Sequence, residues 1–258
     1  MLHRRVGDSL VLISQPAHAW ISGQLADAWG NADVGLEPPP IAVRLAAEQH
    51  DIAWLEWEAA PTLNPETGLP YAFNQLPTLD HLSIWSTSTR RALAYGYLPA
   101  ALISMHGTHL YERYHDFDAD SDDEARAARA FLQRETEFQR DALERISAMY
   151  GLDAGQIQRY RQLVSAWDAM SLALCMGAPE GRQITGLPAL DGLVDIAFQP
   201  NDEALTSYSV SPWPFDRREV LLACEGRVLS GTFDDEEAMR VAVRNAPVVR
   251  LEFRLVPG

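Results

Sequence analysis

The side chains with the clearest capacity for chemistry are histidines and carboxylates in the first two thirds of the 258-residue chain. His18, His50, His81 and His106 lie on segments whose apolar spacing predicts helices or helix starts, and Asp51 directly follows His50. Imidazole and carboxylate groups together suit Zn, Mn or Fe and do not suit Ca. The residue types therefore indicate a transition-metal site, although each residue alone is also typical of a buried hydrogen-bonding role.

A second carboxylate, Asp168, lies in an apolar segment that predicts a helix. Helical spacing places it on the same stripe as Val164, Ser171, Leu172 and Cys175. An isolated carboxylate on such a stripe is costly unless it is paired or bound to a metal. Pairing with an arginine, capping of a neighbouring helix and metal binding each satisfy this requirement.

The order of these residues resembles the signature of the HD superfamily of metal-dependent phosphohydrolases, a His, an adjacent His-Asp pair and a later Asp. The resemblance implies one or two divalent metals, Mn, Fe, Zn or Ni, with Asp51 bridging two metals and with His81 and His106 able to hold the second. The positions that match this signature are His18, His50, Asp51 and Asp168, and the resemblance implies that they bind metal.

The whole chain also resembles a family of uncharacterised bacterial proteins catalogued as a domain of unknown function, and this resemblance implies no activity. The stretches that carry it are 15–18, 49–51, 67–70, 104–107 and 212–215.

Two further histidines are weaker candidates. His109 follows His106 by three residues and suits a ligand, a neighbour of a ligand or a proton donor. His115 begins a second His-Asp pair, but residues 116–124 are an acidic run typical of solvated surface. That run does not match an EF-hand, because Ser121 stands where Gly is needed.

At such a site a metal-bound water would lose its proton near neutral pH and attack phosphorus. Asp51 and His106 are the predicted catalytic residues. All 21 cations are arginines, so Arg90 and Arg91 are the predicted phosphate contacts. Tyr71, in the long loop 59–80, either stacks on a base or packs the loop onto the helices.

The composition excludes several function classes. Without lysine there is no Schiff-base aldolase, pyridoxal-phosphate enzyme, P-loop NTPase or protein kinase. A net charge of −15 excludes the basic surface that duplex nucleic acid requires. No apolar run is long enough for a membrane span or a signal-peptide core, so we expect no membrane partner and a cytoplasmic location.

The expected fold is α+β and mainly α, an HD-like helical bundle with a small antiparallel sheet. Residues 1–177 form the helical metal-binding domain, whose strand 9–14 joins the sheet of a small β-rich region, 178–258. Predicted helices span 15–29, 41–57, 81–95, 99–114, 123–150, 154–176 and 236–245. Predicted strands in the second region span 192–198, 205–210, 220–223, 227–232 and 248–255.

The sequence thus predicts a metal-dependent phosphohydrolase acting on a small phosphorylated molecule or a nucleotide. Three alternatives stay open: a non-catalytic metal-binding regulator or sensor, an HD-type diiron oxygenase, and a structural protein in which these residues are buried hydrogen-bonders. A homodimer is compatible with the sequence.

Overall fold

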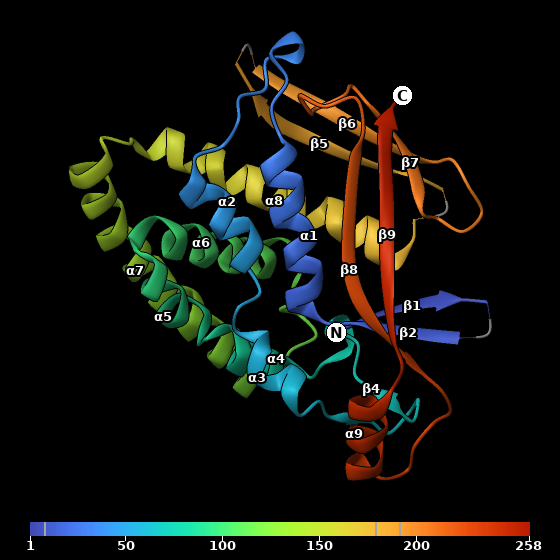
Figure 1. Ribbon diagram of the computed structural model, residues 1–258. Helices are drawn as coiled ribbons and strands as arrows, with labels where there is room; N and C mark the ends of the chain where they lie inside the picture. The colour runs from blue at the N-terminus through green and yellow to red at the C-terminus, as the bar shows by residue number, and fades with distance from the viewer. Residues whose placement is uncertain (8, 179, 191) are drawn as a thin grey trace.

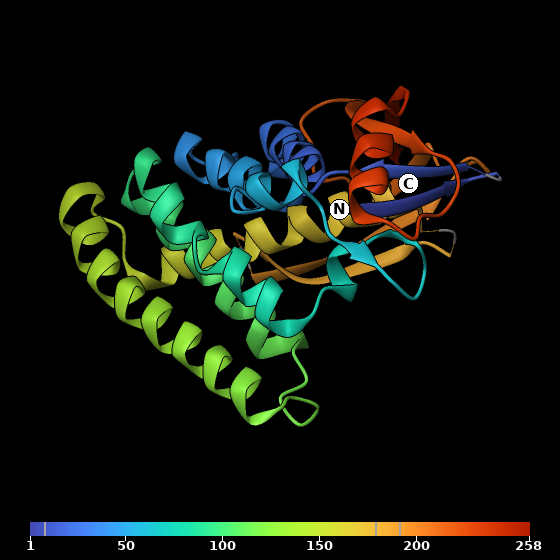
Figure 2. The ribbon, with the colours of Figure 1, turned by 90° about the horizontal axis from the view of Figure 1, so that it is seen from below.

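The computed structural model describes residues 1–7, 9–178, 180–190 and 192–258. A group of helices packs against a curled, seven-stranded sheet, and the helices α1 (Gln15–Ala28) and α8 (Ala154–Met176) lie between the other helices and the strands (Figure 1). Figure 2 shows the same arrangement from below, with most of the helices on one side of the molecule and most of the strands, together with α9 (Glu236–Asn245), on the other. The candidate site residues His18, His106 and Asp168 lie on the helical side, on α1, α6 (Tyr97–Tyr114) and α8.

The sheet contains strands from both ends of the chain. Its strand order is β1-β2-β8-β9-β7-β6-β5, and every neighbouring pair is antiparallel except β7 and β9, which are parallel. The second strand, β2, pairs with β8, and Leu10 lies opposite Leu229 in this pairing. The strands are β1 (Leu2–Val6), β2 (Ser9–Ile13), β5 (Arg182–Ala189), β6 (Gly192–Pro200), β7 (Ser207–Ser211), β8 (Val220–Leu229) and β9 (Val248–Pro257). A separate two-stranded ribbon pairs β3 (Leu63–Asn64) with β4 (Leu69–Pro70).

Local signals place the helices. Ser14 caps α1 by accepting a hydrogen bond from the Ala17 N–H, and Asp153 caps α8 in the same way. The remaining α-helices are α2 (Ile41–Gln49), α3 (Trp54–Ala59), α4 (Thr78–Trp85), α5 (Ser88–Ala92), α6 (Tyr97–Tyr114), α7 (Asp122–Tyr150) and α9 (Glu236–Asn245). Short 3-10 turns cover Ala32–Val34, Phe73–Gln75 and Leu93–Tyr95. None of the helices within the described ranges is long and apolar enough to cross a membrane.

The predicted fold class, a mainly α HD-like bundle with a small antiparallel sheet, is wrong. The sheet has seven strands and is a curled, mixed half-barrel. The strands β1 and β5 were not predicted, and the segments 220–223 and 227–232 form the single strand β8 up to Leu229. The sheet is mixed because β9 inserts between β8 and β7 and runs parallel to β7. Strand pairing of this kind depends on distant segments and leaves no local pattern.

One hydrophobic core connects the helices with the sheet. It contains Trp167 of α8, Leu102 of α6, Phe198 of β6 and Phe253 of β9, all of them nearly inaccessible to solvent. Side chains from both of the predicted regions, 1–177 and 178–258, therefore belong to the same cluster. The position of the site on α1, α6 and α8 is set by this core.

A buried carboxyl group ties three helices together beside this core. Glu135 of α7 accepts hydrogen bonds from the Thr89 hydroxyl on α5 and, at 2.9 Å, from the Ser104 hydroxyl on α6. Glu135→Ala leaves both hydroxyls without an acceptor, so we expect the free energy of unfolding to fall by about 2–3 kcal/mol. Urea denaturation followed by far-UV circular dichroism measures this change. The exposed Glu144 on the same helix is the control, and Glu144→Ala should stay within about 0.5 kcal/mol of the parent. Equal effects of the two variants would contradict the structural role of Glu135.

Candidate metal centre

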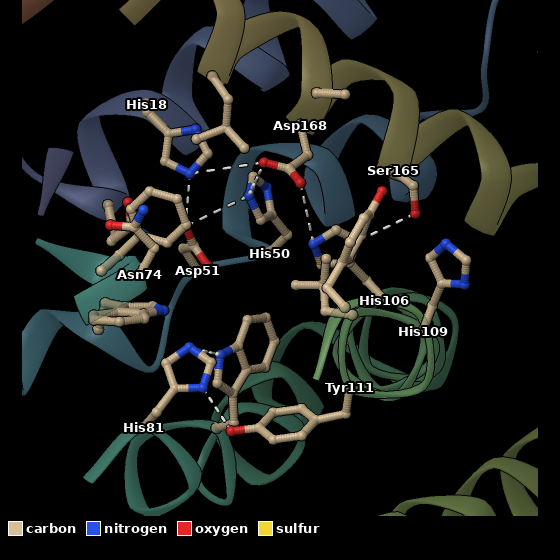
Figure 3. Close-up of a pocket in the computed structure, with 18 of the residues that line it drawn as sticks. His18, His50, Asp51, Asn74, His81, His106, His109, Tyr111, Ser165 and Asp168 are labelled. Carbon is tan, nitrogen blue, oxygen red and sulfur yellow. Dashed lines mark hydrogen bonds and ion pairs between the residues drawn. The ribbon is translucent and has the colours of Figure 1, made fainter. Parts of the chain in front are cut away.

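Three histidines and two aspartates from four parts of the helical layer meet at the inner end of a pocket (Figure 3). His18 comes from α1, His106 from α6 and Asp168 from α8. His50 and Asp51 lie in the turn that connects α2 to α3. All five side chains are buried, so each ionisable group must be balanced by a partner within the protein.

The turn at His50 and Asp51 corrects the prediction of one helix over 41–57. Helix α2 ends at Gln49, and a backbone hydrogen bond of 3.0 Å from the Trp54 N–H to the Asp51 carbonyl closes the turn. In a continuous helix two consecutive side chains diverge by about 100°. Within the turn both point toward His18 (Figure 3). The His50 Nε2 lies 3.5 Å from the Asp51 Oδ2, so both side chains of the pair contribute to one site.

The interatomic distances define a compact ligand set. The His18 Nε2 lies 2.7 Å from the Asp51 Oδ2. The two oxygens of Asp168 face different imidazoles, with Oδ1 3.5 Å from the His50 Nε2 and Oδ2 3.6 Å from the His106 Nε2. Ligand atoms of His18, His50 and Asp168 lie within 4.8 Å of one another. Metal–nitrogen and metal–oxygen bonds of about 2.0–2.2 Å can be formed from such a group with small side-chain movements.

The far nitrogens of the imidazoles fix their orientation. The His50 Nδ1 lies 2.8 Å from the Ala47 carbonyl oxygen, an acceptor, so this nitrogen carries the proton and Nε2 of the neutral ring offers a lone pair. The Ser171 hydroxyl lies 2.8 Å from the His18 Nδ1, and the Ser165 hydroxyl lies 3.2 Å from the His106 Nδ1. Metal-binding histidines are held in this way, with one nitrogen on the protein and the other toward the ion. The Nε2 of His18 is also within hydrogen-bond distance of Asp51, so it would have to exchange that contact for a metal bond.

Two of the Nε2 nitrogens, on the inner side of the imidazoles, have unmet hydrogen-bonding capacity. The Nε2 atoms of His50 and His106 are fully buried and have no hydrogen-bond partner in the described part of the chain. A buried polar atom without a partner costs about 1–3 kcal/mol. Both atoms face the carboxylate of Asp168, at 3.5 and 3.6 Å, a separation that a shared ion could bridge. The donor set therefore fits a transition-metal ion.

The electrostatics of the cluster favour a cation. Burial alone would raise the pKa values of both carboxyls, but the neighbouring imidazole of His50 holds the pKa of Asp51 and that of Asp168 below the usual range. Burial lowers the pKa of His50, but the charges of Asp51 and Asp168 outweigh it and raise that pKa to about 9. Burial lowers the pKa of His106 to about 4. Without a metal the protonated His50 ring thus balances the two ionised carboxylates, and a divalent ion that takes the place of its Nε2 proton could balance them instead.

His81 lies in the same pocket but apart from the cluster (Figure 3). Its Nδ1 is 2.5 Å from the Tyr111 hydroxyl, and the Trp85 indole N–H donates to its Nε2 over 3.2 Å. Because the indole can only donate, Nε2 is unprotonated and Nδ1 carries the proton. Both nitrogens are thus occupied, and His81 would have to give up a contact to bind a second metal; that role stays a prediction.

The predicted phosphate contacts lie elsewhere. Arg90, Arg91 and Tyr71 are absent from the pocket lining formed by the described residues. Arg91 forms an ion pair of 2.5 Å with Glu56. The arginine that lines the pocket is Arg182, the first residue of β5, which follows the helices by a connection that carries no functional pattern in the sequence.

Sequence reasoning also missed Gln15. Its side chain is buried and lines the pocket one helical turn before His18. Residues three apart share a helix face, so the spacing of Gln15 and His18 was a usable signal. Ser165 was also missed, because a serine near a histidine in space need not be near it in sequence. Ser171 was placed on the helical stripe of Asp168, but its contact with His18 was not foreseen.

The pocket is open at one end and holds a cavity of about 400 Å³.

A family model described as a protein of unknown function, DUF3891, matches residues 1–231. The chain belongs to this family. No curated protein and no solved structure matches it. The matched span contains all the residues of the cluster and stops before α9 and β9, although β9 lies inside the sheet.

The contact between Ser171 and His18 gives a test of the ligand geometry. Ser171→Ala removes the partner of the His18 Nδ1 and leaves the ring held only at Nε2, so we expect metal affinity to fall by about 10–100-fold with the fold retained. Competition with a chromogenic chelator measures the affinity. The exposed Ser83 serves as the control, because Ser83→Ala removes a hydroxyl far from the cluster. An unchanged affinity in Ser171→Ala would show that His18 does not depend on this contact.

Proposed function

We propose that this protein is a metal-dependent phosphohydrolase whose centre is formed by His18, His50, His106, Asp51 and Asp168. The observation that carries the proposal is the pair of buried, unpartnered Nε2 atoms, on His50 and His106, within the described chain. They face an ionised carboxylate at the closed end of an open pocket. The order of the residues along the chain, which resembles the HD superfamily motif, supports a phosphoester substrate.

A divalent transition metal held by these residues supplies a Lewis acid and lowers the pKa of bound water toward neutrality. The protein's own residues hold the ligand side chains and fix their orientation. His18 is fixed between Asp51 and Ser171, and His50 is fixed by the Ala47 carbonyl. Asp51 lines the pocket, and its lowered pKa keeps it ionised near neutral pH, so it can orient His18 through Oδ2 or serve as a metal ligand.

The open pocket favours an enzyme over a purely structural metal protein. Structural metal sites are closed by four protein ligands, whereas catalytic sites keep a position for solvent or substrate. Here the cluster residues themselves line a cavity of about 400 Å³, a volume in the range of small-molecule sites. Arg182 at this pocket offers a positive charge to an anionic group.

The experiment combines metal content with turnover. Protein purified without chelator is analysed for transition metals, then assayed with Mn²⁺, Fe²⁺, Ni²⁺ and Zn²⁺ against phosphomonoesters and phosphodiesters. We expect metal in the parent and in His109→Ala, since His109 lies on α6 but points away from the cluster (Figure 3), and loss of metal in His50→Ala. Absence of metal from the parent contradicts the centre. Bound metal without phosphoester hydrolysis contradicts the hydrolase, and oxygen consumption by an iron-loaded form would indicate an oxygenase.

A further inference from the structure

The wall of the pocket beyond the metal-binding group is dominated by aromatic rings. Side chains from α3, the 3-10 turn 73–75, α4 and α6 surround the cavity beside the cluster. Such rings offer flat apolar surface and bind planar groups by stacking or edge contacts. These aromatic residues are Trp54, Phe73, Trp85, Tyr111 and Tyr114.

Positive charge is scarce around the same cavity. Arg182 is the one arginine that lines it within the described ranges, and the sequence contains no lysine. Arg91 is paired with Glu56 and Arg90 is an exposed residue of α5. The net charge of the chain is −15, so the surrounding field repels anions. A ligand with several phosphoryl groups would find too few cations to replace its hydration.

Two buried polar atoms beside the cavity have opposite hydrogen-bonding character. The Gln15 Oε1 is an acceptor and the Trp54 Nε1 is a donor, and neither has a partner among the residues that the structure describes. Both residues are almost inaccessible to solvent. A ligand that enters the pocket can satisfy them, and a planar heteroaromatic group carries such donors and acceptors at its edge.

We infer that the substrate carries a single phosphoryl group on a planar aromatic or heteroaromatic body and is not a nucleoside diphosphate or triphosphate. This inference rests on the proposed function for the role of the phosphoryl group at the metal. The aromatic body lies against the ring-lined wall, and Arg182 together with the metal-binding group receives the one anionic head. The shared chemistry fits a simple aryl phosphate and a nucleoside monophosphate.

The direct test compares ligands that cannot be hydrolysed. Phenylphosphonate and methylphosphonate have the same head group and differ by the aromatic ring, and methylenediphosphonate has two head groups and no ring. Binding to the metal-loaded full-length chain is measured by titration calorimetry. We expect phenylphosphonate to bind at least about tenfold more tightly than either of the others. Equal affinities, or the tightest binding by methylenediphosphonate, would overturn the inference.

Variants separate the two parts of the pocket. Phe73→Leu reduces the aromatic wall and should reduce the ratio of the phenylphosphonate and methylphosphonate affinities. Arg182→Gln should weaken both ligands by the same factor and leave that ratio unchanged. Trp20→Leu is the control, because Trp20 is half-exposed on α1 and lies outside this pocket. If Phe73→Leu proves unstable, Tyr114→Leu replaces it, since Tyr114 is largely exposed and still lines the pocket. A ratio unchanged in whichever of these two variants is folded contradicts the aromatic wall.

Turnover distinguishes failure of the inference from failure of the proposed function. The metal-loaded protein is assayed with phenyl phosphate, adenosine monophosphate, glycerol phosphate and adenosine triphosphate. Faster hydrolysis of either aromatic monophosphate supports the inference and shows which source is preferred. Preference for glycerol phosphate or for the triphosphate overturns the inference and keeps the hydrolase. Selective phenylphosphonate binding without hydrolysis of any ester supports a binding site for one phosphoryl group on an aromatic body and contradicts the hydrolase.

Discussion

Asp168→Asn is expected to lower the affinity of the protein for its metal by more than about 100-fold, beyond the loss typical of residues that only support a ligand. The side chain keeps its shape but loses its charge, and an amide nitrogen replaces one of the two oxygens that face His50 and His106. The substitution therefore removes one anionic ligand and also one of the two carboxylate oxygens that face the imidazoles. Elemental analysis of the purified variant, with competition by a chelator, measures the effect.

The control for Asp168→Asn is an aspartate of similar chemistry outside the cluster. Asp141 of α7 is exposed and pairs with Arg140, so Asp141→Asn should keep the metal content of the parent. Far-UV circular dichroism shows whether Asp168→Asn retains its helices. A folded Asp168→Asn variant with full metal content would exclude Asp168 as a ligand.

The second large effect concerns Arg4, a buried arginine far from any chemistry. Its guanidinium donates to the carbonyl oxygens of Leu174, Cys175, Ala204 and Leu205 at distances of 2.7–3.3 Å. The first two belong to the last turn of α8, where carbonyls lack helical partners and the helix dipole attracts a cation. Arg4 thereby connects β1 to the end of the helix that carries Asp168.

Arg4→Met is expected to lower the free energy of unfolding by about 3–4 kcal/mol, because two buried and two partly buried carbonyls lose this donor at once. Urea unfolding measures the change. The neighbouring Arg5 points outward on the same strand and is exposed, so Arg5→Met should change stability by less than about 0.5 kcal/mol. Similar stabilities of the two variants would show that the carbonyls find other partners.

Much of the helical layer follows from local sequence. The predicted helices over 154–176 and 236–245 are confirmed with those boundaries, since Asp153 and Asp235 cap their first turns. The helix ending at Tyr150 stops at Gly151, which has a left-handed φ of 67°. Caps and glycine stops act within one turn of the chain, so a sequence shows them directly. The helix predicted over 81–95 is instead the pair α4 and α5, which a turn at 86–87 separates.

The sheet could not be predicted to the same extent. In β1 the residues His3, Arg4 and Arg5 interrupt the apolar pattern, and Arg4 is buried only because the end of α8 provides acceptors for it. The parallel pairing of β7 with β9 joins segments separated by the whole of β8 and α9. Such pairings depend on contacts that form after the chain has folded back on itself.

For the candidate site, the sequence by itself determined which residue types are available and the bounds of the helix that carries Asp168, whereas the predicted helices over 41–57 and 81–95 are each broken by a turn. His18, His50, Asp51, His106 and Asp168 were identified from type and order alone, and they are the five that meet (Figure 3). Only the tertiary structure decided that His81 turns to Tyr111 and Trp85, and that Arg182 replaces Arg90 and Arg91 at the pocket. The physical reason is that periodicity specifies which face of a helix is apolar, whereas the packing of helices against a sheet specifies which side chains share a cavity.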